Sequence, residues 1–290
     1  MSQSVNYQFV HLLWATKNIS PLIIEGSQTL LLSYMGGILK GHGGILLAGS
    51  ATSNHIHLLV KMPINLSIAD LVRQIKSCSS RWYKTKDNEH SIFNWNEGYS
   101  AFTVSPFSIN SVKQYLAYEE HRHKKISFEE ELMNFLKIQE IKLNPIYLTS
   151  TTYTKLIYHF VWSVKNRKLF LKNFLEEPLH ECIKLQVEKK HGKLHAIGNV
   201  SDHIHLLVEC SNKISTATLV QDLKSSTTLF IKSKSKYFND FSWQSGHGVF
   251  SVGKSHFEIV SNYVNNQKEH HRVNSFEEEW NWLKQMNNHT

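Results

Sequence analysis

The chain has 290 residues, with 32 Lys and Arg against 24 Asp and Glu, which gives a formal net charge of +8 at pH 7. Both halves are mildly basic: residues 1–148 hold 14 basic and 11 acidic residues, and the remainder holds 18 and 13. Such a balance suits a polyanionic partner without proving one. No apolar run approaches the ~20 residues of a membrane span. Residues 1–6 lack the charged and apolar regions of a secretory signal, so we expect a cytoplasmic protein.

The sequence repeats itself after 148 residues without a gap. Residues 53–60 (SNHIHLLV) return as residues 201–208 (SDHIHLLV). Other pairs keep the same offset: Trp14 with Trp162, Lys76 with Lys224, Tyr115 with Tyr263, and residues 127–131 (SFEEE) with 275–279 (SFEEE). A unit of this length is too long for a solenoid repeat and fits a small domain. We therefore predict two copies of one domain, at 1–137 and 153–290.

The first half of each copy predicts a strand, a helix and two further strands. An apolar, β-rich stretch (9–16 and 157–164) ends in Lys-Asn, a turn signal. A helix follows at 28–40 and at 176–190. After Gly-containing turns come two strands, the second of which contains His-x-His.

The second half of each copy predicts a helix, a strand and a last helix. The first of these helices spans 67–86 or 215–234 and starts at a Ser N-cap. A short strand lies within 93–104 or 241–252, and the last helix starts near Ser108 or Ser255 and contains the repeated tyrosine. The order β-α-β-β-α-β-α predicts an α+β fold of two ferredoxin-like domains, each with an antiparallel sheet covered by helices on one face.

Residues 138–152 match nothing at the repeat offset and are predicted to be the linker. Pro145 and the Ser and Thr content support a linker. Apolar residues within it predict packing against a neighbouring surface; they are Ile141, Leu143, Ile146 and Leu148.

Two histidines lie two residues apart in each copy, at His55 and His57 and again at His203 and His205. Residues i and i+2 of a strand face the same side, so each pair presents two imidazoles together. Two imidazoles on one rigid strand supply two of the three protein ligands that a metal site needs. A single His-x-His is more often incidental, but its return in a second copy whose other residues have mostly changed favours a functional pair.

The last predicted helix offers a third ligand. Tyr263 and Gln267 are spaced i, i+4, so we expect them on one helix face. The Gln267 carbonyl oxygen could complete a divalent metal site, with Tyr263 directed at whatever the metal polarises. The first copy has Tyr115 and Glu119 at these positions, and a carboxylate is an equally good ligand for Mg²⁺ or Mn²⁺. A tyrosine alone at such a position would ordinarily be packing.

Together these residues resemble the HUH endonuclease superfamily, specifically the single-tyrosine transposases of the IS200/IS605 type and their REP-associated relatives. The resemblance covers nearly all of both copies. The first copy departs at Asn54, where the family usually has Asp, and at Glu119, where it usually has Gln. The matching motifs of the second copy are 158–166 (YHFVWSVKN), 202–208 (DHIHLLV), 223–226 (LKSS), 241–246 (FSWQSG) and 263–271 (YVNNQKEHH).

The resemblance implies a metal-dependent endonuclease and strand transferase acting on single-stranded DNA. In that family a divalent ion polarises the scissile phosphate, and a tyrosine attacks it to leave a 5′-phosphotyrosine and a free 3′-OH, without ATP. The expected DNA partner carries an imperfect hairpin. The implied nucleophiles are Tyr115 and Tyr263, and the implied ligands of Mg²⁺ or Mn²⁺ are His55, His57, Glu119, His203, His205 and Gln267.

A basic stripe on the second predicted helix recurs in both copies and suits DNA phosphates. An ordinary solvated helix face explains any single one of its lysines equally well. The residues are Lys76, Lys84 and Lys86, mirrored by Lys224, Lys232 and Lys234.

Three other functions compete with that of a single-stranded DNA endonuclease. Histidine-triad nucleotide hydrolases need a third His where this chain has Leu59 and Leu207. Two-histidine phosphoesterases carry His-x-Thr or His-x-Ser, which neither histidine pair matches. The serious alternative is a domesticated descendant that binds DNA hairpins or regulates without cutting, against which the retained His, His and Tyr of both copies count.

The duplication itself predicts a monomeric chain that forms an internal pseudo-dimer. Single-domain relatives typically work as two-fold dimers, and a fusion would make that interface permanent. Two assemblies of the sites remain open. In trans, His55 and His57 would work with Tyr263 and Gln267, and the other pair with Tyr115 and Glu119. In cis, each site would lie within one copy, which we favour slightly because such sites occur in REP-associated relatives.

Overall fold

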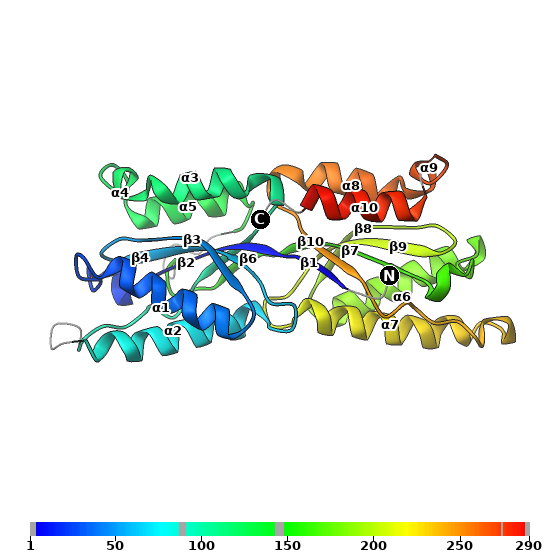
Figure 1. The fold of residues 1–290 in the computed structure, drawn as a ribbon, viewed down its shortest axis with the longest axis horizontal. Coiled ribbons are helices and arrows are strands. Elements are labelled where there is room, and N and C mark those ends of the chain that lie inside the picture. Colours follow the sequence, from blue (N-terminus) through cyan, green and yellow to red (C-terminus); the bar gives the residue numbers. More distant parts are fainter. Residues whose placement is uncertain (1–3, 87–90, 143–147, 274, 288–290) are drawn as a thin grey trace. The chain divides into compact units, whose positions relative to one another are not determined.

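The computed structural model describes residues 4–86, 91–142, 148–273 and 275–287 (Figure 1). It forms two compact units, each built mainly from one repeat. The first-repeat unit comprises Phe9–Val104 and Ser108–Lys155. The second-repeat unit comprises residues 1–8, Ser105–Phe107 and 156–290.

The first-repeat unit follows the predicted order and adds elements at its end. Its strands are β2 (Phe9–Ala15), β3 (Ile45–Ala51), β4 (His55–Lys61), β5 (Ser100–Val104) and β6 (Tyr153–Lys155). Its helices are α1 (Gln28–Gly41), α2 (Ile68–Lys84), α3 (Ile109–Ala117), α4 (Glu119–Arg122) and α5 (Phe128–Ile138), with the 3-10 turn η1 (Lys17–Ile19).

The second-repeat unit has the corresponding elements. Its strands are β1 (Val5–Tyr7), β7 (Ile157–Ser163), β8 (Lys193–Asn199), β9 (His203–Glu209) and β10 (Gly248–Ser251). Its helices are α6 (Glu176–Lys189), α7 (Thr216–Lys232), α8 (Phe257–Asn265), α9 (Gln267–His270) and α10 (Phe276–Asn287). Its 3-10 turns are η4 (Lys165–Arg167), η5 (Asn173–Leu175), η6 (Lys236–Phe238) and η7 (Lys254–His256), and η2 (Pro106–Ser108) follows β5.

The predicted fold class, α+β with two ferredoxin-like domains, is confirmed. Each unit has a five-stranded sheet, in the order β3-β4-β2-β5-β6 or β8-β9-β7-β10-β1. Four strands of each sheet are antiparallel, and the histidine strands β4 and β9 lie in the interior next to β2 and β7.

The fifth strand of each sheet comes from the other repeat. β1 pairs in parallel with β10, with Val5 opposite Gly248, and β6 pairs in parallel with β5, with Tyr153 opposite Ser100. These two short strands occupy equivalent positions in the two copies. The compact units therefore differ from the predicted sequence domains 1–137 and 153–290, because each repeat gives its opening strand to the other unit.

Helices cover both faces of each sheet, whereas one covered face was predicted. In the first-repeat unit, α1 and α2 lie on one side of the sheet and α3 and α5 on the other (Figure 1). Every residue of β2 and of β7 is buried, as expected for strands covered on both sides. The second layer contains the predicted tyrosine helices α3 and α8 together with α5 and α10, which the predicted element order lacks. It encloses the side of the sheet on which the paired histidines lie.

The predicted linker, residues 138–152, packs at both of its described ends. Leu148 is buried with Phe128 and Tyr153, and Ile141 contacts the same cluster. Leu143, Pro145 and Ile146 lie outside the described residues. Among the helices of the described chain, none combines the length and the apolar character needed to cross a membrane.

Candidate active site

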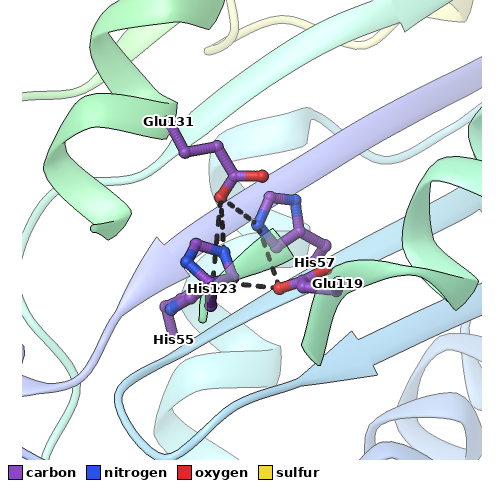
Figure 2. Close-up of side chains that lie close together, drawn as sticks. All are labelled: His55, His57, Glu119, His123 and Glu131. Atoms are coloured by element: carbon purple, nitrogen blue, oxygen red, sulfur yellow. Dashed lines mark hydrogen bonds and ion pairs between the residues drawn. The ribbon is translucent and has the colours of Figure 1, made fainter. Parts of the chain in front are cut away.

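The His-x-His strand places both imidazoles of each pair on one buried face. In the first copy, His55 Nε2 lies 2.9 Å from Glu119 Oε1, and His57 Nε2 lies 3.3 Å from the same oxygen. Figure 2 shows His55 and His57 of β4 and Glu119 of α4 converging, with Glu131 of α5 beside them. The predicted ligands His55, His57 and Glu119 therefore lie together in the first copy. In the second copy His203 and His205 lie together, and the role of Gln267 as a ligand stays a prediction.

The tyrosine and the third ligand lie on two helices, because the predicted helix breaks between them. α3 ends at Ala117 and α8 at Asn265, and the break residues Tyr118 and Asn266 have ψ values of 11° and 22°. Glu119 and Gln267 then begin the short helices α4 and α9. The expectation of one continuous helix face was wrong, but Gln267 still contacts Tyr263 by donating to its backbone carbonyl over 3.3 Å.

A glycine brings the second-copy helix break close to the sheet. A Cβ at Gly198 in β8 would lie 2.0 Å from the carbonyl oxygen of Val264 and 3.1 Å from Gln267 Cγ. Any other residue would have to push α8 away from β8. Gly198 therefore fixes the depth at which Gln267 enters the site.

A glutamate from the last helix of each copy joins the site, and the sequence-based analysis did not assign it a role. Glu131 Oε2 lies 3.1 Å from His57 Nε2, and Glu279 Oε2 lies 3.3 Å from His205 Nε2. Both glutamates are buried. The Tyr115 hydroxyl donates a hydrogen bond to Glu131 Oε1, and Tyr263 does the same to Glu279 Oε1. The repeated SFEEE segment was the available signal.

A third histidine was also missed in each copy. His123 Nε2 lies 3.1 Å from Glu131 Oε2, and His271 Nε2 lies 3.2 Å from Glu279 Oε2 and 2.9 Å from His203 Nε2. Potential ligand atoms of these groups all lie within 4.8 Å of one another. The groups are His55, His57, Glu119, His123 and Glu131 in the first copy, and His203, His205, His271 and Glu279 in the second.

Hydrogen bonds to the Nδ1 atoms orient the paired histidines. Another buried histidine holds the second member of each pair: His11 Nε2 lies 2.9 Å from His57 Nδ1, and His159 Nε2 lies 3.0 Å from His205 Nδ1. Such contacts direct the Nε2 atoms toward the shared cluster.

The residue before each pair holds its first histidine, and here the copies differ. Asn54 Oδ1 lies 2.7 Å from His55 Nδ1, and Asp202 Oδ1 lies 2.7 Å from His203 Nδ1. Asp202 also accepts a 2.9 Å hydrogen bond from Arg167, whose backbone φ of 55° places it in the left-handed region.

The charges of the site follow from burial and these contacts. Burial lowers the pKa of His55 and of His205 to about 4. Burial would also lower the pKa of His203, but hydrogen bonds to the Asp202 and Glu279 carboxylates raise it above its ordinary value. Burial opposes ionisation of Glu279, yet the surrounding histidines hold its pKa far below the usual range.

Each tyrosine is half-buried against its glutamate. Burial, together with the neighbouring carboxylate, raises the pKa of Tyr115 and of Tyr263 well above the ordinary value. Both phenols are therefore protonated at neutral pH, and a nucleophilic tyrosine here would need a group that removes its proton.

The donors present fit a divalent cation. Each copy gathers imidazole nitrogens and an ionised carboxylate in a buried cluster, and these donor types suit Mn²⁺ and related ions. Gln267 Oε1 supplies a further observation, since within the described residues no hydrogen-bond donor reaches this buried oxygen. An acceptor buried without a donor is costly unless a ligand satisfies it.

The lysines of the predicted DNA stripe lie in different surroundings. Lys76 and Lys224 are directed at the backbone, each donating to three successive loop carbonyls, of residues 96–98 and 244–246. They fix a loop, so phosphate contact by them stays a prediction. Lys84 donates to Asn94 Oδ1. The exposed members are Lys86, which lies over the Trp82 ring, Lys234, which lies over the Phe230 ring, and Lys232.

Known proteins were compared with the chain. The family described as "Transposase IS200 like" matches residues 4–119 and 152–267. No curated protein matches. A solved Deinococcus radiodurans R1 protein described as a transposase is 22% identical, over 39% of this chain and 91% of its own, with a TM-score of 0.32. A REP-associated tyrosine transposase bound to a REP hairpin is 13% identical, over 40% and 68%, with a TM-score of 0.34. At these scores the two structures add nothing to the family match.

Proposed function

Because the chain belongs to the IS200-like transposase family, which matches both of its repeats, we propose that it is a metal-dependent endonuclease and strand transferase for single-stranded DNA. One observation carries this proposal. In each copy, a tyrosine hydroxyl, a histidine pair and a buried carboxylate lie together in one cluster. A tyrosine that serves only in core packing would be expected to lie among apolar side chains and not beside a histidine pair and a buried carboxylate.

The chemistry assigned to the tyrosine is transesterification. The Tyr115 or Tyr263 oxygen attacks a backbone phosphorus, the bond from phosphorus to the 3′ oxygen breaks, and that oxygen leaves as a 3′-OH. The DNA 5′ end is then held as a phosphotyrosine. Attack by another 3′-OH reverses the step, so rejoining needs no ATP because the phosphodiester energy is retained.

A bound divalent ion would polarise the scissile phosphate and stabilise the charge that develops on it. The residues proposed to hold it are His55, His57 and Glu119 with His123 and Glu131, and His203, His205 and Gln267 with His271 and Glu279. Their burial would also keep competing water away from the phosphotyrosine.

The DNA partner proposed is a single strand with an imperfect hairpin. The net charge of +8 favours association with a polyanion, and exposed Lys232 and Lys234 offer phosphate contacts. The second site opens into a hollow of about 410 Å³, lined by Tyr263, His270, Glu278, Glu279 and Trp282. A hollow that reaches the tyrosine gives a DNA strand access to the nucleophile.

The test is covalent capture of DNA by the full chain. Oligonucleotides covering the DNA that flanks the gene would be labelled at the 3′ end and incubated with Mn²⁺ or with EDTA. We expect a protein–DNA adduct with Mn²⁺, its loss with EDTA, and its loss in the variant Tyr115→Phe with Tyr263→Phe. Undiminished cleavage by that double variant would contradict the covalent mechanism.

The second candidate is a DNA-binding protein that does not cut, and one contact favours it for the first site. The Arg122 guanidinium lies 3.1 Å from Glu131 Oε1 and 3.7 Å from Glu119 Oε2, where it competes electrostatically with a divalent ion. Tight hairpin binding without any adduct from the unaltered chain would support this candidate.

A further inference from the structure

We propose that Glu131 and Glu279 are the proton acceptors of the two tyrosines: each takes the phenolic proton as the tyrosine oxygen attacks DNA. This inference rests on the proposed function and adds a catalytic residue to it. In both copies the glutamate comes from a helix that follows the tyrosine helix, α5 after α3 and α10 after α8.

Each tyrosine hydroxyl is close enough to its glutamate for direct proton transfer. A general base must lie within hydrogen-bonding distance of the proton that it removes. The Tyr115 hydroxyl already donates to Glu131 Oε1, and the Tyr263 hydroxyl donates to Glu279 Oε1. The same oxygen of the equivalent glutamate accepts the hydrogen bond from the tyrosine in both copies.

The two oxygens of each glutamate contact different partners. While Oε1 accepts from the tyrosine, Oε2 of Glu131 lies 3.1 Å from the Nε2 atoms of His57 and His123. In the second copy, Oε2 of Glu279 lies 3.2 Å from His271 Nε2. Figure 2 shows Glu131 directed at the histidines of the first copy. The glutamate therefore joins the tyrosine to the histidine cluster and holds the tyrosine oxygen beside it.

The basicity of the glutamate decides when it can accept the tyrosine proton. A carboxylate is a much weaker base than a phenolate, so it cannot remove the proton from a resting phenol. The tyrosine O–H becomes far more acidic as its oxygen bonds to phosphorus. A weak base that is already hydrogen-bonded can accept the proton at that stage, in concert with attack.

The atoms balance in this step. The tyrosine O–H bond breaks and the proton passes to Glu Oε1, the oxygen–phosphorus bond forms, and the phosphorus–3′-oxygen bond breaks. The 3′ oxygen takes a proton from water. When another 3′-OH attacks the phosphotyrosine, the glutamate returns its proton to the tyrosine oxygen.

The same helix supplies a matched control. Glu277 precedes Glu279 by two residues, is exposed and belongs to the same repeated segment. Glu277→Gln therefore removes a carboxylate from α10 without touching the site. The Glu279→Gln substitution keeps an acceptor oxygen for the tyrosine, but an amide cannot take the phenolic proton at neutral pH.

The experiment isolates the second site by using the chain with Tyr115→Phe, His55→Ala and His57→Ala as the parent. Mn²⁺ affinity of Glu279→Gln, Glu279→Asp and Glu277→Gln is measured first, by electron paramagnetic resonance on DNA-free protein. Single-turnover adduct formation is then followed at saturating Mn²⁺ from pH 6 to 9. For Glu279→Gln we expect a loss on the order of 10²- to 10⁴-fold at pH 7 that shrinks as pH rises. Glu279→Asp should lose less, and Glu277→Gln should match the parent.

Two results would overturn the proposal. One is a Glu279→Gln rate within about threefold of the parent at every pH, because a true general base contributes far more. The other is a loss that disappears at high Mn²⁺, since that assigns the glutamate to metal binding alone. If Glu279→Gln fails to fold or binds no Mn²⁺, Glu131→Gln in the chain with Tyr263→Phe, His203→Ala and His205→Ala gives the same test. Failure of the proposed function is separate: there the parent itself forms no adduct.

Discussion

The two sites use the same backbone positions but distribute their charges differently. Where the first copy has Glu119, the second has Gln267, and where the first has Arg122, the second has His270. Arg122 lies against both glutamates of its site and over the Tyr115 ring, 3.5 Å from the ring centroid. An added carboxylate is thus accompanied by an added guanidinium, and the formal charge of the pair stays the same. The comparison indicates that the differences at these two positions compensate each other in charge.

Two other differences lie at the edges of the sites. Asn54 holds His55 where Asp202 holds His203, so only the second copy places a carboxylate behind its first histidine. Asn134 occupies the position of Trp282, which is 45% exposed and whose ring centroid lies 5.8 Å from that of Tyr263. The second copy therefore has an aromatic surface beside its tyrosine that the first copy lacks.

The largest expected effect tests whether each active site takes its histidines and its tyrosine from the same copy. Each described tyrosine lies beside the histidines of its own copy. His55→Ala with Tyr263→Phe should therefore abolish adduct formation, because it removes one essential residue from each site. The matched variant, His203→Ala with Tyr263→Phe, damages one site twice and should keep the activity of the first. Assembly in trans would reverse these two results, which capture of labelled DNA distinguishes directly.

The next prediction concerns the compensating pair. Starting from His203→Ala with His205→Ala, so that only the first site binds metal, Glu119→Gln should lower Mn²⁺ affinity on the order of 10- to 100-fold, because Arg122 loses a compensating anion. Arg122→His alone should raise affinity.

The combination of Glu119→Gln and Arg122→His recreates the second site and should nearly restore the starting affinity. Isothermal titration calorimetry on DNA-free protein measures all four forms. Effects that simply add would show that the two residues do not compensate each other.

A smaller effect is expected at the aromatic difference. Trp282→Ala should weaken single-stranded DNA binding by about 1–2 kcal/mol, because an exposed indole can stack on a base. Asn134→Ala, at the equivalent position of the first copy, should leave affinity unchanged. Fluorescence anisotropy with a labelled oligonucleotide checks both, and equal losses would show that Trp282 offers no special surface.

The smallest effect is a pKa difference between the first histidines. The Asp202 carboxylate helps to raise the pKa of His203, so Asp202→Asn should lower that pKa. A raised histidine pKa stabilises the fold below about pH 6.5 and loses that contribution as pH rises through the folded-state value. The substitution should therefore cost more stability at pH 6 than at pH 8. Imidazole NMR titrations of metal-free protein, with Asn54→Asp as the reciprocal variant, test this difference.

The sequence was enough to predict the parts of the fold and site that depend on local pattern. The ungapped repeat identified the strand carrying His203 and His205 and the helix carrying Tyr263, and period-two spacing predicted that the two histidines share a strand face. The apolar β7 sequence IYHFVWS also indicated burial on both sides, which the single-face expectation overlooked.

The rest depended on long-range packing. Glu279 and His271 lie beyond the expected last helix, and only the fold brings α10 back over the histidine strand. Lys224 has the spacing of a basic helix face, but its ammonium group meets the carbonyls of a loop about 20 residues away. Helical periodicity assigns a residue to a face and does not reveal what packs against that face.

The exchanged edge strands bear on how the protein is made. Residues 5–7 complete their sheet only when residues 248–250 are available to pair with them. At ribosomal speeds, synthesis of the intervening ~240 residues takes roughly 10–50 s, and during this time the first strand of the nascent chain has no partner. The first-repeat sheet, in contrast, closes as soon as residue 155 has left the ribosome. The two similar units therefore complete their sheets at different times during synthesis. A chain truncated before residues 248–250 would leave residues 5–7 without a strand to pair with, and an unpaired strand edge promotes aggregation.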